Sequence, residues 1–168
     1  MKHWLIYLVF TAGVIVLGAL PFENHDVGEL RPVETILVTR QNGQVHIQTD
    51  TGDHGAGRNW TDALEDMRRH APGSLFAATG SFLLLGQSAE ALAEELAGYR
   101  ELNPNCAICR TDERQAAKNL ADIGPFLQAH PPEVTLRDLR AANANRQRQT
   151  LPQLICENGG YLLVQPEH

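Results

Sequence analysis

Residues 58–86 place a helical pattern directly before an uninterrupted apolar run. Asn59 is a residue type that caps helix N-termini, and Pro72-Gly73 is a pair that ends helices. The apolar stripe of this helix consists of Trp60, Leu64, Met67 and Ala71. Residues 82–85 (FLLL) then lack polar alternation, which predicts a strand covered on both faces. Because such a strand lies inside a sheet, this segment predicts an α/β domain.

Two β-hairpins are predicted, one before and one after this segment. The first joins residues 33–39 to residues 45–49 through Asn42-Gly43, which is the strongest short-range hairpin signal. The second joins residues 151–156 to residues 161–164. Antiparallel pairs are therefore expected near both ends of the domain.

Three further helices are expected between residues 88 and 144. Their predicted N-caps are Ser88, Thr111 and Thr135. Gly124-Pro125 is expected to end the second of them, and Asp138 forms a capping-box-like pair with Thr135. The fold class that follows is α/β (α+β), with N- and C-terminal β-hairpins in a mixed β-sheet and about four helices packed on it, preceded by one N-terminal transmembrane helix.

Residues 1–22 are predicted to be that transmembrane anchor. Residues 4–20 are free of charge and, at about 1.5 Å per residue, span about 25 Å, close to the ~30 Å hydrocarbon core of a bilayer. Residues 17–21 (LGALP) form a poor signal-peptidase site, so an uncleaved anchor is preferred to the alternative of a removed signal peptide. Residues 23–30 are expected to form a linker, and residues 31–166 a single globular domain.

Charges around the anchor predict its orientation. Lys2 precedes the apolar run, and Glu23, Asp26 and Glu29 follow it. The positive-inside rule then places the N-terminus in the cytoplasm and the domain outside it, in a single-pass protein of the cell membrane. The formal charge of −6 argues against nucleic acid as a partner, because a nucleic-acid groove normally needs a basic stripe.

The three cysteines leave several interpretations open. Cys106-x-x-Cys109 is the spacing of a thiol redox pair, and Cys156 is left over. The pair falls within a predicted strand, where residues three apart point to opposite faces. Buried structural thiols are therefore preferred to redox chemistry, and a structural disulfide remains the third possibility.

Other candidate sites in the sequence are weaker. Asp50-Thr51-Gly52 also occurs in aspartic proteases, but that chemistry needs two such carboxylates, so residues 52–57 (GDHGAG), His54 included, are interpreted as a flexible linker. Trp60 is expected in the core. A further cluster is interpreted as a solvated loop in preference to a lipid-headgroup contact: Arg140, Arg146 and Arg148. The seven histidines lack zinc-site spacing, so no metal, cofactor or catalytic residue is assigned.

Several segments resemble the N-terminal domain of the Ger(x)C family, the C subunit of spore germinant receptors. The matching residues are Ala63-Leu64 and Met67 in the helix, Leu75-Phe76 and Leu84-Leu85-Gly86 around the strand, and the later segments 134–139 (VTLRDL) and 151–154 (LPQL). The chain lacks the lipobox cysteine and the further domains of that family. The resemblance therefore implies a diverged, single-domain relative.

Together these patterns predict a membrane-anchored, non-enzymatic extracytoplasmic domain that acts through protein–protein contacts, with membrane proteins as partners and no small-molecule substrate identified. The resemblance implies that these contacts serve spore germination. Two alternatives remain: an envelope thiol-disulfide oxidoreductase using Cys106 and Cys109, and an anchored partner-binding domain unrelated to germination.

Overall fold

The computed structural model describes residues 30–72, 74–76, 79–157 and 159–166. The predicted anchor (1–22) and residues 23–29 of the predicted linker lie outside these ranges. Within the described ranges, no helix has both the length and the apolar character needed to cross a bilayer.

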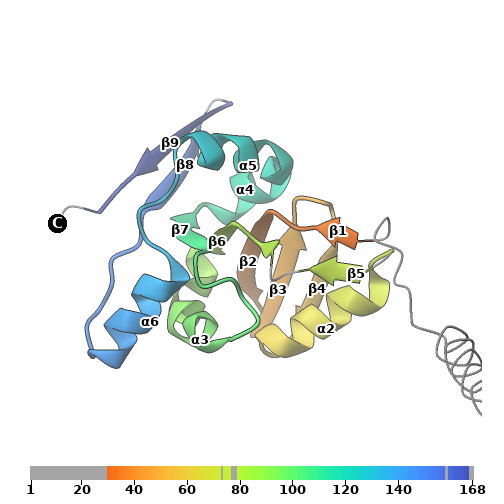
Figure 1. Cartoon of the computed structure of the whole chain (residues 1–168). Coiled ribbons are helices and arrows are strands. Elements are labelled where there is room, and N and C mark those ends of the chain that lie inside the picture. The colour runs from red at the N-terminus through yellow and green to blue at the C-terminus, as the bar shows by residue number, and fades with distance from the viewer. Residues whose placement is uncertain (1–29, 73, 77–78, 158, 167–168) are drawn as a thin grey trace, which may run out of the picture. The chain divides into compact units, whose positions relative to one another are not determined.

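The described part of the chain begins with four strands, ends with two, and carries its helices between them, interrupted by three further strands (Figure 1). The strands are β1 (Leu30–Pro32), β2 (Thr35–Gln41), β3 (Gln44–Thr49), β4 (His54–Gly57), β5 (Ser74–Phe76), β6 (Phe82–Gly86), β7 (Ala107–Thr111), β8 (Gln153–Glu157) and β9 (Gly160–Val164). The helices are α2 (Trp60–His70), the 3-10 helix η3 (Gln87–Leu92), α3 (Ala93–Gly98), α4 (Glu113–Lys118), α5 (Leu120–Ala129) and α6 (Leu136–Ala144).

Seven of the strands form one mixed sheet, in the order β4-β3-β2-β6-β7-β8-β9. The four central strands, β2, β6, β7 and β8, are mutually parallel. Both predicted hairpins are confirmed, with Val38 opposite Ile47 in the first and Ile155 opposite Leu162 in the second. Strands β1 and β5 form a separate two-stranded sheet that the sequence did not predict.

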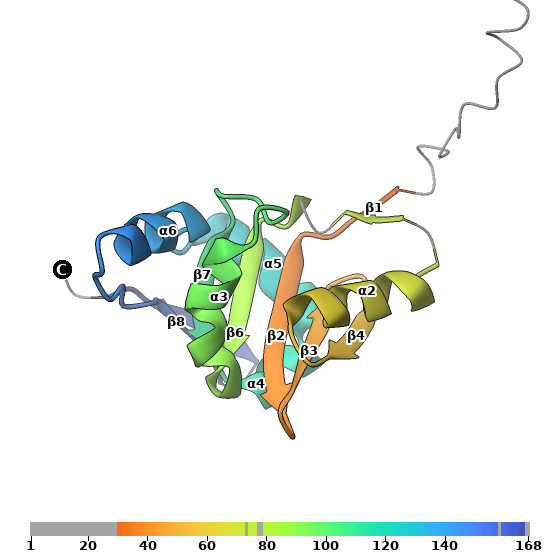
Figure 2. The same cartoon turned by 90° about the horizontal axis from the view of Figure 1, so that it is seen from below.

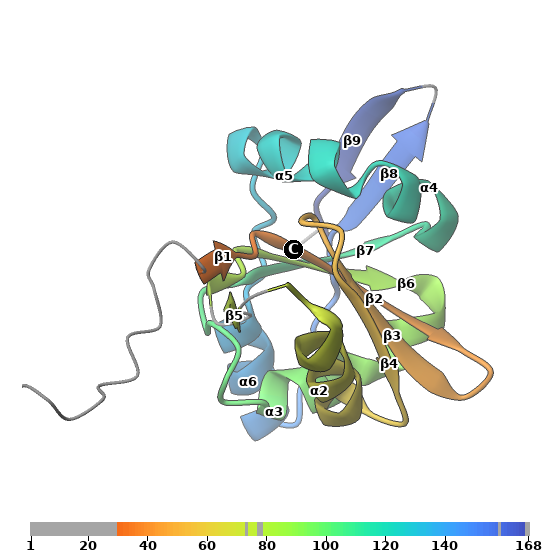
Figure 3. The same ribbon diagram turned by 90° about the vertical axis from the view of Figure 1, so that its right-hand side faces the viewer.

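Helices cover both faces of the seven-stranded sheet, as the views in Figures 2 and 3 show. Helices α2, α3 and α6 share one apolar core with one face of the sheet, and α4 and α5 share a second core with the other face. All five residues of β6 are buried, which confirms the prediction of a strand covered on both faces. The α/β class predicted from the sequence is therefore correct, and the described residues contain five α-helices where about four were predicted.

Residues 54–57 form strand β4, so the prediction of a flexible loop is wrong here. Strand β4 pairs with β3 and lies at one edge of the sheet. Its glycines let α2 approach the backbone closely: a Cβ at Gly55 would lie 2.2 Å from the carbonyl oxygen of Ala63, and one at Gly57 would lie 2.3 Å from the Ala63 nitrogen. The glycines that suggest flexibility are thus needed for packing.

Three predicted helix boundaries are wrong as well. Ser88 caps no helix, because its hydroxyl accepts a hydrogen bond from the backbone N–H of Arg40. Asp112, and not Thr111, caps α4. Pro125 lies inside α5 and does not end it. The helical segment is interrupted earlier, at Asn119, which separates α4 from α5. Burial of the apolar face of α5 offsets the hydrogen bond that the proline cannot make.

Two predicted caps are confirmed. Asn59 accepts a hydrogen bond from the backbone N–H of Asp62 at 2.9 Å. Thr135 and Asp138 form a complete capping box at the start of α6, which spans the predicted residues. Local side-chain chemistry therefore determines where these two helices begin.

Candidate functional site

The cysteine pair lies on opposite faces of the sheet. Cys106 belongs to the core under α2, α3 and α6, and Cys109 to the core under α4 and α5. All three cysteines are free and buried. Burial raises the pKa of the Cys106 thiol to about 12 and raises that of Cys109 further. Both thiols are therefore held in the protonated form, which is a poor nucleophile.

The Asp50 carboxylate supports the start of β2. Its two oxygens accept hydrogen bonds from the backbone N–H of Glu34 at 3.4 and 3.3 Å. Burial raises the pKa of Asp50, these backbone hydrogen bonds oppose the rise, and the nearby Glu34 carboxylate adds to it. The Glu34 side chain in turn accepts a hydrogen bond from Gln128 on α5. These hydrogen bonds hold the start of β2 in place. They do not resemble the arrangement of an aspartic protease, in which two carboxylates share a proton.

Two other residues singled out in the sequence also hold the fold together. Trp60 is 2% exposed, which confirms the prediction that it lies in the core. Arg140 donates from Nε to the carbonyl of Ala97 at 2.6 Å and from Nη2 to the carbonyl of Tyr99 at 2.7 Å. The prediction of a solvated loop is thus wrong for Arg140, which ties α6 to the end of α3, whereas Arg146 and Arg148 are exposed.

A hollow of about 940 Å³ opens at the carboxyl ends of the parallel strands, which is a common place for ligands in α/β folds. His46 and His54 line it from β3 and β4. Its acidic residues hold backbone groups: Asp66 accepts from Ala56 N–H at 3.1 Å, and Glu113 from Ser88 N–H at 2.9 Å. Among the described residues, no three potential metal ligands come together.

The β8–β9 hairpin forms the opposite edge of the sheet from β4 (Figure 1). Leu162 and Val164 of β9 are 59% and 46% exposed, and they are the large apolar side chains of the described residues that are most open to solvent. Ile155 lies directly opposite Leu162 on β8 and is half-buried. The face of β9 that carries Leu162 and Val164 is therefore apolar and open to solvent.

Within the described part of the chain, the outer edge of β9 also presents backbone groups that have no partner strand. Only two residues separate β8 from β9, so the flanking pair, Glu157 and Gly160, exchanges hydrogen bonds across the turn. Hydrogen-bonded pairs alternate along an antiparallel ladder, so the N–H and C=O groups of Tyr161 and Leu163 point away from β8. These groups can pair with a further strand.

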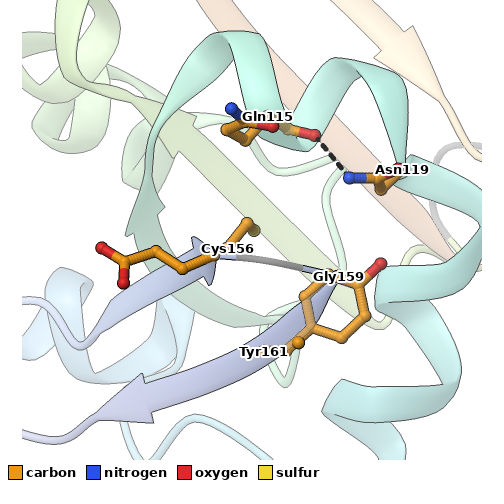
Figure 4. A pocket seen from close by; sticks show the side chains of 7 residues that line it. Gln115, Asn119, Cys156, Gly159 and Tyr161 are labelled. Carbon is orange, nitrogen blue, oxygen red and sulfur yellow. Dashed lines mark hydrogen bonds between the residues drawn. The ribbon is translucent and has the colours of Figure 1, made fainter.

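Two hollows border this edge and share Tyr161. One, of about 370 Å³, lies between β9 and the end of α5, where Phe126 stacks on His130 and packs against Tyr161. In the other, of about 230 Å³, Gln115 and Asn119 lie on the helical side, and Cys156 and Tyr161 lie on the hairpin (Figure 4).

The Gln165 side chain fixes the end of β9. It donates to the carbonyl of Pro131 at 3.2 Å and accepts from the backbone N–H of Glu133 at 3.3 Å. The exposed edge is therefore held in place by the loop that follows α5.

The two edge strands of the seven-stranded sheet, β4 and β9, differ in whether their outer edges are covered. On β4, the Asp66 carboxylate binds the outward N–H of Ala56, and α2 packs on Gly55 and Gly57. Among the described residues, no helix or strand packs along the outer edge of β9, and β9 has no charged side chain between Gly160 and Val164. Natural proteins usually blunt an open edge with charges, proline or a covering element. An unprotected edge with exposed apolar side chains is typical of a contact surface.

Sequence reasoning identified the second hairpin but not this surface. The missed signal is the run Tyr161-Leu162-Leu163-Val164, which is apolar at every position. In an internal strand such a run is covered on both faces, but in an edge strand one set of side chains faces solvent. The strand order decides between these cases.

No family model, no curated protein and no solved structure matches this chain. The functional argument therefore comes from the residues and geometry described above.

Proposed function

We propose that this chain is a membrane-tethered, extracytoplasmic domain that acts through protein contacts, and that the free edge of β9 is its docking site. The observation that carries the proposal is the uncovered apolar strand at a sheet edge, with Leu162 and Val164 exposed. The predicted anchor in residues 1–22 supports the membrane location.

Binding would proceed by addition of an extended strand to the sheet. The outward N–H and C=O groups of Tyr161 and Leu163 supply main-chain hydrogen bonds, which give affinity without requiring a particular sequence. Leu162 and Val164 offer apolar contact on one face of the added strand. On the other face, the hollow beside Phe126 can receive a side chain of that strand.

Spore germination is the setting that we propose for these contacts, on the strength of the resemblance to germinant-receptor C subunits. In that case the gene is transcribed only during sporulation and lies beside genes for the two membrane subunits of such a receptor. Transcription during vegetative growth would favour an anchored partner-binding domain of another kind.

The geometry favours protein contacts over thiol-disulfide exchange. Cys106, directly before β7, and Cys109, within β7, lie in the cores on opposite faces of the sheet, so their side chains cannot meet in a disulfide while β7 remains in the sheet. Their raised pKa values also keep both thiols protonated near neutral pH.

Site-specific photo-crosslinking in the native membrane tests the docking edge. A photoreactive amino acid at position 162 or 164 of the full chain is expected to give protein adducts. The matched control is position 44, because Gln44 is also exposed and also lies in a β-hairpin, but in the one at the other side of the sheet. Absence of adducts at both 162 and 164, with folded protein in the membrane, would overturn the proposal.

A further inference from the structure

We infer that the strand that docks on β9 is β9 of a second copy of this chain, paired antiparallel about a two-fold axis. The inference rests on the docking edge proposed above and names its occupant. The hydrogen-bonding pattern, the positions of the apolar side chains and the charge of the strand all support self-pairing.

The outward backbone groups are self-complementary. The backbone groups of Tyr161 and Leu163 point outward, and extending the same alternation one residue beyond Val164, the last residue of β9, brings those of Gln165 to this edge. In an antiparallel pair centred on Leu163, Tyr161 of one copy exchanges hydrogen bonds with Gln165 of the other, and the two Leu163 residues pair with each other. Every outward N–H and C=O group of this segment then has a partner.

This register also buries the exposed apolar side chains. It places Leu162 of each copy directly opposite Val164 of the other, in positions that are not hydrogen-bonded. Side chains are closest at such positions, with Cα atoms about 4.5 Å apart. Leu162 and Val164 are the two most exposed large apolar residues of the described chain. In the dimer each would contact the other across the axis, so two such pairs would form.

Charge favours approach at this strand. The chain has a formal charge of −6, so two copies repel each other over most orientations. Residues 160–166 (GYLLVQP) contain no Asp, Glu, Lys or Arg. Antiparallel pairing of this segment therefore places no like charges opposite each other, which would weaken a cross-strand contact.

Pairing through β9 limits the assembly to two copies of the chain. Two sheets joined through β9 make one continuous sheet whose outer edges are both β4. Each β4 is covered by α2 and has an outward N–H bound by Asp66. An isologous contact that uses the uncovered edge of the seven-stranded sheet yields a dimer and not a fibre.

The contact is small, and this sets the conditions under which it forms. Specific stable interfaces bury about 800 Å² per partner, which is more than the edge of the five-residue strand β9 supplies. We therefore expect weak association in dilute solution and strong association when residues 1–22 confine both copies to one membrane, because tethering raises the effective concentration.

Cysteine cross-linking between two differently tagged full-length variants, Leu162→Cys and Val164→Cys, tests the register. Opposed positions with Cα atoms 4.4–6.8 Å apart can form a disulfide. In vesicles that contain both variants, mild oxidation is expected to give about tenfold more disulfide-linked dimer than in vesicles that contain either variant alone. Efficient linking of Leu162→Cys to itself would overturn this register and with it the proposal.

Two controls define the result. The wild-type chain is expected to stay uncross-linked, because its three thiols are buried. A mixed pair of Gln41→Cys and Gln44→Cys proteins, which places thiols at opposed exposed sites of the other hairpin, is expected to give no link between copies. Circular dichroism melts confirm that the exposed-site variants are folded.

The photo-crosslinked adducts separate the two proposals. An adduct at position 162 with twice the chain mass of 18.5 kDa supports the second copy. An adduct of another mass, together with failure of the mixed disulfide, overturns self-pairing and leaves the docking edge intact. Absence of any adduct overturns both.

Discussion

Gly55 and Gly57 are two positions where the absence of a Cβ atom is required by the packing of the fold. At Gly55 and Gly57 the backbone of α2 lies so close to β4 that any Cβ would overlap it. The overlap involves backbone atoms, which cannot move aside as a flexible side chain can. These two residues therefore allow α2 to cover the edge of the sheet.

Gly55→Ala is expected to destabilise the domain by about 1–3 kcal/mol, as overpacking of a tight contact usually does. The added Cβ would lie 2.2 Å from the Ala63 carbonyl oxygen and 2.6 Å from the Met67 nitrogen. Urea unfolding followed by tryptophan fluorescence measures the change, because Trp60 lies at the start of α2.

Gly98→Ala is the matched control. Gly98 is the last residue of α3, and a Cβ there meets nothing within 4 Å. This variant is expected to be neutral or to gain up to about 1 kcal/mol, through a less flexible unfolded chain. An equal loss at both glycines would show that close packing of α2 on β4 is not the cause.

Glycine also marks where sequence reasoning failed at this scale. The segment GDHGAG indicates flexibility when read alone, because glycine tolerates many backbone conformations. The same glycines are required by the close approach of α2, which follows them in the chain, and no local pattern reveals that contact. By contrast, the opposite-facing cysteines were predicted correctly, because alternation along a strand is a local property.

At the scale of elements, α6 is positioned by its capping box and by the segment before it. The Thr135 hydroxyl donates to Asp138 Oδ2 at 2.6 Å, and the backbone N–H of Thr135 donates to the same oxygen at 2.9 Å. Beside it, Ile108 N–H donates to the Val134 carbonyl, and Leu136 N–H to that of Cys106. The start of α6 is thereby fixed against β7.

Thr135→Ala is expected to lower stability by about 1 kcal/mol, because it removes the N-cap of α6. Thr150→Ala is the control, since Thr150 is exposed and lies outside helices and strands. Chemical denaturation at pH 7 measures both variants. A loss of similar size at Thr150 would attribute the effect to threonine removal in general and not to the cap.

The pH dependence of this cap has a defined sign. The Thr135 side chain and then its backbone N–H lower the pKa of Asp138 from its ordinary value of 3.8. The folded state therefore favours the carboxylate, so the stabilising contribution is complete above about pH 4 and is lost as the pH falls through the lowered pKa. The difference between wild type and Asp138→Asn is expected to shrink below that pH.

Elements with local signals were predicted well, and those that depend on tertiary contacts were not. Asn42-Gly43 predicted the first hairpin because both residues adopt positive φ, 51° and 79°. Pro125 predicted a helix end, but α5 continues past it. Burial of Ile123 and Leu127 on either side of the proline stabilises the helix there. Burial of the apolar face of a helix can stabilise it by more than a proline destabilises it.

At the scale of the whole molecule, strand order is what the sequence left open, and the candidate site depends on it. The patterns predicted a mixed sheet and two hairpins but could not say that β9 lies at an edge. Its apolar run becomes a solvent-exposed surface only in that position. The proposed docking site could therefore be located only once the sheet was known.

Membrane topology is the last property of the whole chain that can be tested. The predicted anchor places the domain outside the cytoplasm, so trypsin added to intact protoplasts is expected to cleave it. Exposed sites are available at Arg146 and Arg148, in the segment between α6 and β8. Full protection of the wild-type domain in intact protoplasts, with cleavage after detergent, would contradict this orientation.

A charge-reversal variant supplies the matched comparison. The triple variant Glu23→Lys, Asp26→Lys and Glu29→Lys puts three positive charges just beyond the apolar run, in place of three negative charges in the wild type. Positive charge is retained on the cytoplasmic side, so the variant is expected to invert and become protected from trypsin. Because the described domain begins after these residues, its fold should be the same in both orientations, and equal trypsin fragments after detergent would verify that. Cleavage of both proteins in intact protoplasts would show that the flanking charges do not determine the orientation.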